Sequence, residues 1–436
     1  MRDTEHREYV IIGGGITGLA LANWLPDDSY VIIEREPEIG GYCKTIRRNG
    51  YTWDYSGHFF HFQRKEIEQY LFARMEPQRM YRGAKRCYIH YDGQLVDYPF
   101  QKNIHQLKKA DCLACLYDLF FRENRAVYTF KDMLIAHYGH SIAEKFLIPY
   151  NEKVYSVDLD RLDPEAMGRF FPHVSVEEIV QNFRSHGEDT SYNAEFTYPA
   201  GGALEYVKAL ARDIPAGNIC VNEQVLEVDI PKKTIVTNKR TLSYGKLVNT
   251  IPLPRFLDVC GWDYDPEAYT CGKVLVFNLG FDRKGWEGVH WVYFPQVDLS
   301  FYRVGFYDNL FASDKMSLYV EIGLPIAARV DESVVRKALD RVLIELEGCG
   351  IVRGHKLVDW HSVVMAPAYV HITPLSQRET SRQRSELGHF GVSSIGRYGA
   401  WTYCSIEDNI IQGMEHAMEL QGEAWTRTTE AEVLPA

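Results

Sequence analysis

Short apolar runs alternate with a helical pattern near the N-terminus. Residues 9–12 (YVII) and 30–33 (YVII) are continuous apolar runs of the kind found in buried parallel strands. A helical period begins between them, near Ile16. The pattern predicts a strand–helix–strand unit at the start of the chain.

The apolar positions take a helical period between residues 106 and 183. Helix N-cap signals recur there, such as Thr129 with Asp132 and Ser175 with Glu178. We expect four or five short helices in this segment. The first should bury a face formed by Leu107, Ala110, Leu113, Ala114, Tyr117 and Phe121.

Strand patterns return elsewhere in the chain. Residues 88–98 (YIHYDGQLVDY) place Asp92-Gly93 between two apolar-aromatic runs, which predicts a hairpin. Strands at residues 224–235 and 246–250 should rejoin the first sheet. Runs at hairpin-like spacing predict a mostly antiparallel second sheet, over residues 274–281, 290–294, 300–306 and 317–322.

These elements predict an α/β fold with interleaved parts. A Rossmann-like dinucleotide-binding domain would comprise residues 1–85, 196–262 and 385–436. A helical subdomain (103–192) would be inserted into it. A mostly antiparallel β-sheet domain would comprise residues 86–102 and 265–384.

Charge and composition narrow the classes of partner. The 436 residues carry 48 Lys and Arg against 59 Asp and Glu, a net charge of −11, so bulk electrostatics do not favour nucleic acid or an anionic membrane. No run of eighteen apolar residues is present, and the first eight residues do not resemble a signal peptide. We therefore expect a cytoplasmic protein with no membrane segment.

The sequence does not predict a metal site. The nine cysteines are scattered, which indicates free thiols. Cys112 and Cys115 form C-x-x-C, but within a predicted helix and without a second pair. His58 and His61 lie three apart, yet no H-E-x-x-H motif or cysteine partner accompanies them.

A glycine fingerprint joins the first strand to the first helix. Gly13, Gly15 and Gly18 fill G-x-G-x-x-G, the spacing that permits a tight turn, a close approach by pyrophosphate, and close packing of helix on strand. Pyrophosphate would lie at the helix N-terminus. Glu34, at the end of the second strand, is placed to accept hydrogen bonds from ribose hydroxyls.

A second glycine pair distinguishes between FAD and NAD as the candidate cofactor. Gly40-Gly41 and Thr45 follow Glu34 in the pattern E-x5-GG-x3-T. This stretch resembles flavoproteins of the amine-oxidase, phytoene-desaturase and sugar-mutase superfamily, in which the second glycine pair lies against FAD. The resemblance implies that the Rossmann-like domain binds FAD rather than NAD.

Later motifs narrow the resemblance to one family. The segments are SGHFFHF, YPFQKNI, IPYNEKVY, NAEFTYPAGG, KLVNTIP, WVYFP with SFYR, and GRYGAWTY, spread over almost the whole chain. In this order they resemble the UDP-galactopyranose mutases, the eukaryotic-type sequences more than the short bacterial ones. The implied protein is a flavoprotein isomerase that binds a nucleotide sugar.

The resemblance implies a uridine and sugar pocket. A phenol ring can stack on uracil while a glutamine amide pairs with the base edge. Tyr155 stands where the family usually has tryptophan, which bears on the preferred hexose or pentose. The residues implied on this side are Tyr98, Gln101, Phe146, Asn151, Tyr155 and Asn193.

The resemblance also implies a diphosphate clamp and a flavin contact set. Arg169, which aligns with the family's mobile-loop arginine, and Arg303 would bind the diphosphate, with Tyr293, Tyr369 and Tyr403 supplying phenols. His58 would lie beside the isoalloxazine, and it completes the catalytic set with these two arginines, although neither His58 nor His61 is assigned as an acid or base. Further cofactor contacts are implied at Val225, Arg397 and Asp408.

The implied reaction interconverts the pyranose and furanose forms of a UDP-sugar, with UDP-galactose as the first candidate. Reduced FAD would attack the anomeric carbon through N5, and an external reductant such as NAD(P)H would keep the flavin reduced. No Ser-His-Asp set or paired carboxylates are evident, as expected when the cofactor is the nucleophile. Three alternatives stay open: an FAD oxidase or desaturase of the same superfamily, a mutase for another nucleotide sugar, and a silent UDP-sugar-binding relative. The physiological reductant and the oligomeric state are also open.

Overall fold

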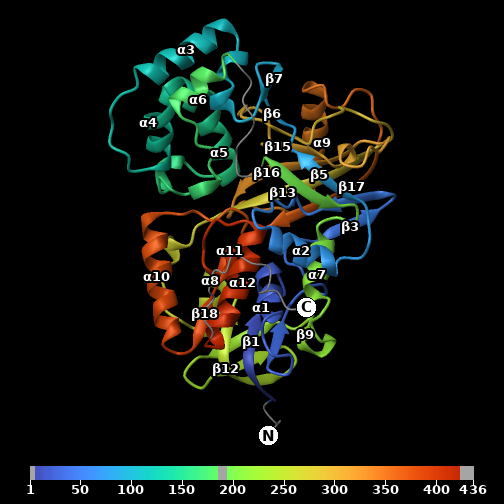
Figure 1. Ribbon diagram of the computed structural model, residues 1–436, viewed down its shortest axis with the longest axis vertical. Helices are drawn as coiled ribbons and strands as arrows, with labels where there is room; N and C mark the ends of the chain where they lie inside the picture. Colours follow the sequence, from blue (N-terminus) through green and yellow to red (C-terminus); the bar gives the residue numbers. More distant parts are fainter. Residues whose placement is uncertain (1–4, 185–193, 423–436) are drawn as a thin grey trace.

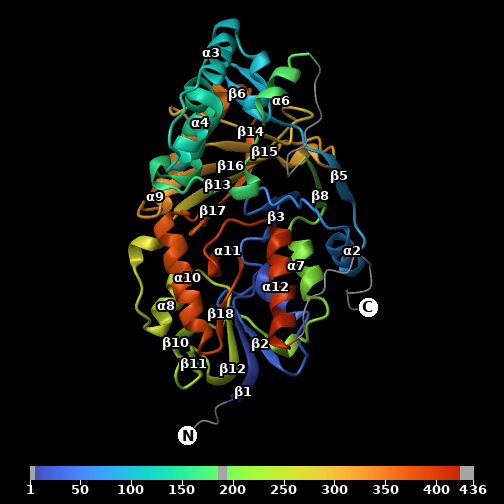
Figure 2. The same ribbon diagram turned by 60° about the vertical axis from the view of Figure 1, so that its left-hand side comes forward.

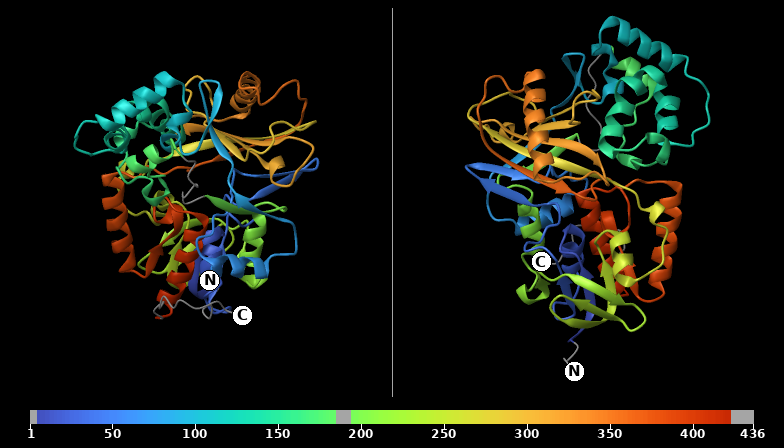
Figure 3. Two further views of the ribbon diagram at one scale, coloured as in Figure 1. Left: turned by 45° about the horizontal axis from the view of Figure 1, so that its top comes forward. Right: turned by 180° about the vertical axis from the view of Figure 1, so that it is seen from behind.

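The computed structural model describes residues 5–184 and 194–422. Figure 1 shows a lower group of elements around β1, an upper sheet, and a set of helices beside that sheet. Figure 3 shows the same arrangement from two other sides. The α/β fold class predicted from the sequence is confirmed by these two sheets and their helices.

The lower group is built on a seven-stranded, mostly parallel sheet. Its order is β10-β11-β12-β1-β2-β9, and β18 also pairs with β12. The predicted apolar runs lie in β1 and β2, which pair in parallel, and helices cover them so that the runs are buried. The bounds are β1 Glu5–Ile12, β2 Tyr30–Ile33, β9 Ile219–Cys220, β10 Val225–Asp229, β11 Thr234–Thr237, β12 Thr241–Asn249 and β18 Val392–Ser394.

Helix α12 (Ile406–Leu420) packs directly on helix α1 (Ile16–Ala22), the helix of the glycine fingerprint. Figure 1 shows α12 beside α1, and Figure 2 shows α12 in front of the strands of the lower sheet. The contact is backbone on backbone, because a Cβ at Gly413 would lie 2.7 Å from Leu21 N and 2.8 Å from Thr17 O. The predicted cap at Ser405 with Asp408 is present as a capping box. The chain's last described helix therefore begins beside the glycine turn.

The upper sheet has seven strands in the order β17-β13-β16-β15-β14-β6-β7, antiparallel except where β14 meets β6. The predicted hairpin joins β6 to β7 through Asp92 and Gly93, both with positive φ. Helix α9 (Glu332–Gly348) buries its apolar face against this sheet. The bounds are β6 Cys87–Tyr91, β7 Gln94–Asp97, β13 Gly272–Phe281, β14 Trp291–Tyr293, β15 Arg303–Phe306, β16 Ser317–Pro325 and β17 Leu357–Met365.

The helical group consists of α3 (Lys109–Phe120), α4 (Phe130–Ile142), α5 (Ile148–Tyr155) and α6 (Val176–Gln181). The buried face predicted for the first helix is wrong. Helix α3 begins after Leu107 and buries Cys115 and Leu119 instead, whereas the side chains of Leu113 (55% exposed) and Tyr117 (65% exposed) point outward. The caps at Thr129 and Ser175 are confirmed.

The remaining helices and strands connect these groups. They are β3 Thr45–Arg48, β4 Tyr51–Asp54, α2 Lys65–Arg74, β5 Met80–Ala84, β8 Glu195–Pro199, α7 Leu204–Ala211, α8 Leu253–Cys260, α10 Pro374–Gly388 and α11 Gly396–Gly399. Among the helices of the described ranges, none is both long and apolar enough to cross a bilayer.

The close approach of α12 to α1 gives a stability prediction. Replacing Gly413 with alanine should lower the free energy of unfolding by about 1–3 kcal/mol, because the added methyl group meets backbone that cannot move aside cheaply. Gly388, at the end of α10, is the matched control because a Cβ there meets nothing within 4 Å. Thermal unfolding of both variants checks the prediction, and equal melting temperatures would contradict the packing described.

Candidate functional site

A cavity of about 1310 Å³ runs between the lower sheet and the upper sheet. Its wall includes the glycine turn after β1, the second glycine pair, the start of α12, the end of α5, and strands of the upper sheet. Because its wall extends from the ends of the parallel strands to the antiparallel sheet, the cavity has room for a dinucleotide and a second ligand.

Two glycine turns face each other across the narrow part of this cavity. A Cβ built on Gly41 would lie 3.6 Å from Gly15 Cα, and one built on Gly15 would lie 4.0 Å from Gly41 Cα. The Gly40 N–H donates to Gly14 O at 2.7 Å, which ties the two turns together. Side chains here would fill the space that a pyrophosphate needs, so these residues fit a dinucleotide such as FAD.

The other fingerprint glycines are required by packing. Gly13 has φ +109°, and a Cβ there would lie 2.4 Å from Thr250 Oγ1. A Cβ on Gly18 would lie 2.1 Å from Gly13 O. Gly18 does not line the cavity; it lets α1 approach the turn, as its place in the motif predicts.

Glu34 lines the cavity and also holds the glycine turn. Its Oε2 accepts from Gly14 N at 2.8 Å, and its Oε1 accepts from Glu36 N at 2.9 Å. Each carboxylate oxygen can accept more than one hydrogen bond, so capacity for ribose hydroxyls stays open. The Glu34 carboxylate thus also holds the backbone of the glycine turn in place through these hydrogen bonds, a role that the sequence did not indicate.

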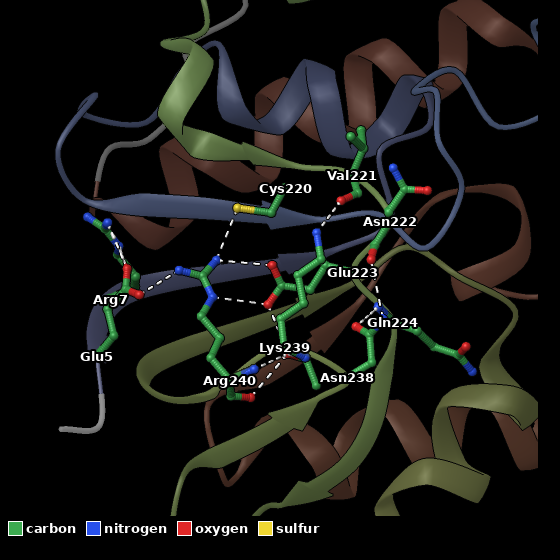
Figure 4. A network of polar contacts seen from close by, with 11 residues as sticks. Glu5, Arg7, Cys220, Val221, Asn222, Glu223, Gln224, Asn238, Lys239 and Arg240 are labelled. Carbon is green, nitrogen blue, oxygen red and sulfur yellow. Dashed lines mark hydrogen bonds and ion pairs between the residues drawn. The ribbon is translucent and has the colours of Figure 1, made fainter. Parts of the chain in front are cut away.

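An ion-pair network supports the wall beyond Glu34 (Figure 4). Arg240 donates to Glu223 through Nε at 3.0 Å and pairs with Glu5, and its Nη2 lies 3.0 Å from Cys220 Sγ. Glu223 lines the cavity beside Val225, one of the residues predicted to contact the cofactor. The network fixes the β9–β10 connection on β1 and thereby this end of the wall.

Thr45 departs from its predicted role as a cofactor contact. It does not line the cavity; its hydroxyl donates to Asp54 Oδ1 at 2.5 Å and accepts from Leu204 N at 3.0 Å. Asp54 also accepts from Tyr198 OH at 2.8 Å and from Ala203 N. The hydroxyl is occupied by the buried carboxylate that anchors the start of α7.

Arg397 presents a guanidinium to the cavity that lacks a carboxylate partner in the described residues. Its Nη1 donates to Cys404 O at 3.0 Å, and its buried Nε makes no hydrogen bond there. A buried cation without an anion is unfavourable, so this arginine favours an anionic ligand. Ser405 and Glu407, at the start of α12, line the wall beside it.

Asp408, predicted as a cofactor contact, is not part of this wall. It caps α12 with Ser405 and forms an ion pair with Arg169. Arg169, in the short helical turn Gly168–Phe170, lines the cavity but keeps its side chain half exposed. In this structure the predicted mobile-loop arginine is therefore held at the N-terminus of α12.

Arg303 lines the cavity from β15 and is paired, not isolated. Its Nε and Nη2 each donate to Glu321 of the neighbouring strand β16 at 2.7 Å. Glu321 is fully buried and also accepts from Ser56 Oγ. Three of the five guanidinium hydrogens, two on Nη1 and one on Nη2, remain for a ligand anion while Glu321 fixes the plane of the group.

His58 lines the cavity next to this pair. Burial, with Arg303 and Arg397 nearby, lowers the pKa of His58 to about 4, so the ring is neutral at pH 7. Its backbone N–H donates to Ser56 O at 2.7 Å, and Nδ1 lacks a partner within the described ranges. His61 instead lies against Glu195 O, and no group of three metal-ligating side chains occurs in the part of the chain that the structure describes.

The predicted uridine pocket is only partly assembled at the wall. Tyr98 lines it, and its ring centroid lies 5.3 Å from that of Tyr293, which also lines the cavity but was predicted as a diphosphate contact. Gln101 is buried behind it, because its Nε2 donates to Pro172 O at 2.6 Å. Phe146 also lies behind the wall, stacked on Tyr150 with centroids 5.1 Å apart, and Tyr150 takes the place at the surface.

The remaining predicted substrate residues gather near Arg397. Tyr155, Tyr369, Tyr403 and Asn151 all line the cavity. The Tyr369 and Tyr403 rings are stacked at 6.1 Å, and the Arg397 guanidinium lies 4.5 Å from the Tyr403 ring centroid. Asn193 lies outside the described residues.

Sequence reasoning missed two residues of the site. Tyr150 lies between Pro149 and Asn151 in the segment IPYNEKVY. Its position next to the predicted contact Asn151 could have indicated that it lines the site. Glu321 interrupts an otherwise apolar strand, LYVEIG, and a charge in such a run indicates a buried partner. That partner proves to be Arg303.

Known proteins resemble this chain in both sequence and fold. A family model, the NAD(P)-binding Rossmann-like domain, matches residues 11–72. A UDP-galactopyranose mutase of Mycoplasma pneumoniae is 21% identical over 64% of this chain and 67% of its own length. The predicted resemblance to the UDP-galactopyranose mutases is confirmed.

Solved structures support the same fold. A crystal structure of reduced UDP-galactopyranose mutase matches with a TM-score of 0.88 and 24% identity, over 98% of this chain and 97% of its own. Cyclohexylamine oxidase of Brevibacterium oxydans matches with a TM-score of 0.67 and 13% identity, over 95% of this chain and 99% of its own. The fold is therefore shared between mutases and amine oxidases, and fold alone does not assign the reaction.

Asp54 gives a prediction for pH dependence. Burial raises its pKa to about 7, although hydrogen bonds from Thr45 and Tyr198 oppose the shift. The pKa in an unfolded chain is about 3.9. The stabilisation from the protonated carboxyl is therefore complete below about pH 4 and is lost as the pH rises to 7.

The variant Asp54→Asn removes this titration. The melting temperature of the unaltered protein, relative to that of the variant, should fall between pH 4.5 and pH 7.5. Thermal unfolding across that range is the measurement. Parallel curves for the two proteins would contradict the raised pKa.

Proposed function

We propose that this chain is a flavin-dependent mutase that interconverts the pyranose and furanose forms of a UDP-sugar, with UDP-galactose as the first candidate. The observation that carries the proposal is one continuous cavity with a dinucleotide cradle at one end and two arginines and several phenols at the other. The resemblance to UDP-galactopyranose mutases along most of the chain supports the same assignment.

FAD would lie between the two glycine turns, with Glu34 and Val225 toward its adenosine and Arg397 and the start of α12 toward its ring. Bound FAD in its reduced form would supply the nucleophile at the sugar's anomeric carbon. The N-terminal dipole of α12 and the Arg397 guanidinium both favour negative charge on an adjacent group. An external reductant such as NAD(P)H belongs to this proposal.

Arg303 would bind the diphosphate of the substrate. Its guanidinium plane is fixed by Glu321, so the free Nη1 edge points in a set direction at no further entropic cost. Tyr98, Tyr150 and Tyr293 would form the aromatic surface for uracil. Arg169 would add a second cation after leaving Asp408.

The neutral His58 would not act as a proton donor at pH 7, because burial and two nearby arginines disfavour its charged form. With Arg303 and Arg397 nearby, the His58 ring would form part of the cavity wall beside the reacting groups. Leaving UDP would stay bound to the arginines and tyrosines, which would keep it available to return to the sugar.

The direct test is to reduce the protein with dithionite, add UDP-galactose under anaerobic conditions, and analyse the nucleotide sugars by chromatography. UDP-galactofuranose should form with reduced protein only. An amine or lipid oxidase of the same fold would consume oxygen without prior reduction and would ignore UDP-sugars. Absence of product with every UDP-hexose and UDP-pentose would exclude the mutase.

The Arg303→Lys variant tests the clamp. Lysine keeps the charge but cannot pair with Glu321 and a phosphate through one planar fork, so kcat/KM should fall by about 10²–10³-fold. Steady-state kinetics of reduced enzyme provide the measurement. Arg336→Lys, on the exposed side of α9, should leave the rate unchanged; an equal effect in both variants would argue against the clamp.

A further inference from the structure

Tyr155 ends α5 with a buried ring and a hydroxyl that is open to the cavity. The residue is 1% exposed and lines the cavity. No hydrogen bond joins its hydroxyl to another described residue, and the hydroxyl is open to the cavity rather than enclosed by protein. A hydroxyl that faces the cavity can donate to or accept from a polar group of a ligand bound there.

The position of Tyr155 is fixed through its backbone by His371. The His371 Nε2 lies 2.9 Å from Tyr155 O, and its Nδ1 lies 3.0 Å from Thr270 Oγ1. A carbonyl can only accept, so Nε2 carries the hydrogen and Nδ1 accepts from the threonine hydroxyl. Burial lowers the pKa of His371, which agrees with this neutral form. The ring thus satisfies one of the carbonyls that a helix leaves unpaired at its end.

The C-terminal end of α5 packs closely against two glycines of the upper sheet. A Cβ at Gly272 would lie 2.7 Å from Tyr155 O, and one at Gly323 would lie 1.8 Å from Lys153 O. The last turn of α5 therefore rests on the backbone of β13 and β16. This contact fixes the backbone position from which the Tyr155 side chain reaches the cavity.

The same segment that carries His371 also fixes Tyr369. Residues 368–371 pair with the start of β13 through Ala368 N to Gly272 O and Gly272 N to Tyr369 O, each 2.9 Å. The rings of Tyr155 and Tyr369 meet edge to face with centroids 5.7 Å apart. Two segments more than 200 positions apart in the chain thus form one phenol-rich corner.

This corner lies on the cofactor side of the substrate cavity. Tyr369 and Tyr403 surround the Arg397 guanidinium, which is assigned to the cofactor. Tyr98, Tyr150 and Tyr293, assigned to uracil, instead contact one another. The part of a UDP-sugar that reaches Tyr155 is therefore the part nearest the cofactor, which is the sugar.

We propose that Tyr155 determines sugar specificity by hydrogen bonding through its hydroxyl to a hydroxyl of the sugar, and that His371 is the positioning residue that holds it there. The assignment rests on the proposed function, because it takes the ligand to be a UDP-sugar. To the proposed function it adds a hydrogen bond that would distinguish one sugar from another, whereas the contacts to uracil and diphosphate would be the same for every UDP-sugar.

Binding to the oxidised protein tests this without turnover. Isothermal titration should give a Kd for UDP-galactose about three- to tenfold higher for Tyr155→Phe than for the unaltered protein, the effect of one neutral hydrogen bond. The Kd for UDP should stay within twofold. Tyr117→Phe, on the exposed face of α3, is the matched control and should change neither value.

Two variants of His371 test the positioning role. His371→Gln keeps a side-chain N–H that can reach Tyr155 O, and should bind UDP-galactose like the unaltered protein. His371→Leu removes the donor and should reproduce the loss seen in Tyr155→Phe, with UDP binding kept. Retained UDP binding distinguishes this result from general misfolding.

Three outcomes would overturn the assignment. Equal UDP-galactose affinity in Tyr155→Phe and the unaltered protein would show that the hydroxyl is not used. An equal loss for UDP and UDP-galactose would place Tyr155 at the nucleotide. Failure of the unaltered protein to bind either ligand would instead contradict the proposed function itself, and this assignment with it.

Discussion

The approach of backbone to backbone around the glycine turns is the constraint on which the rest of the structure depends. Gly18 lets α1 reach the turn at Gly13, and Gly413 lets α12 reach α1. Gly15 and Gly41 leave the narrow part of the cavity free of side chains. A methyl group at any of these contacts would close space that a pyrophosphate or a helix must occupy.

Two partly buried arginines that line the cavity set its chemistry in a chain whose net charge is −11. Arg303 is neutralised and oriented by Glu321, whereas Arg397 has no carboxylate among the described residues. The first can offer one guanidinium edge to an anion in a fixed direction, and the second needs an anion for its own stability. Arg303 is therefore suited to a substrate that binds and dissociates, and Arg397 to a cofactor that remains bound.

Local patterns predicted much of this protein. Apolar runs located β1 and β2, and Asp92-Gly93 located the hairpin. The predictions that were wrong mostly concern side chains that form hydrogen bonds with another part of the fold. Gln101 donates to Pro172, Thr45 bonds Asp54, and the exposed face of α3 follows from a helix start that periodicity does not specify. Those partners lie 9 to 71 positions away, and only the folded chain brings them together.

In the proposed reaction, a flavin held in this cavity would act without being consumed. The most direct measurement is the number of product molecules formed per flavin after a single stoichiometric reduction under anaerobic conditions, with the flavin spectrum recorded throughout. We expect many molecules of furanose product per flavin and a spectrum that stays reduced. One product or fewer per flavin, with the spectrum returning to the oxidised form, would contradict it.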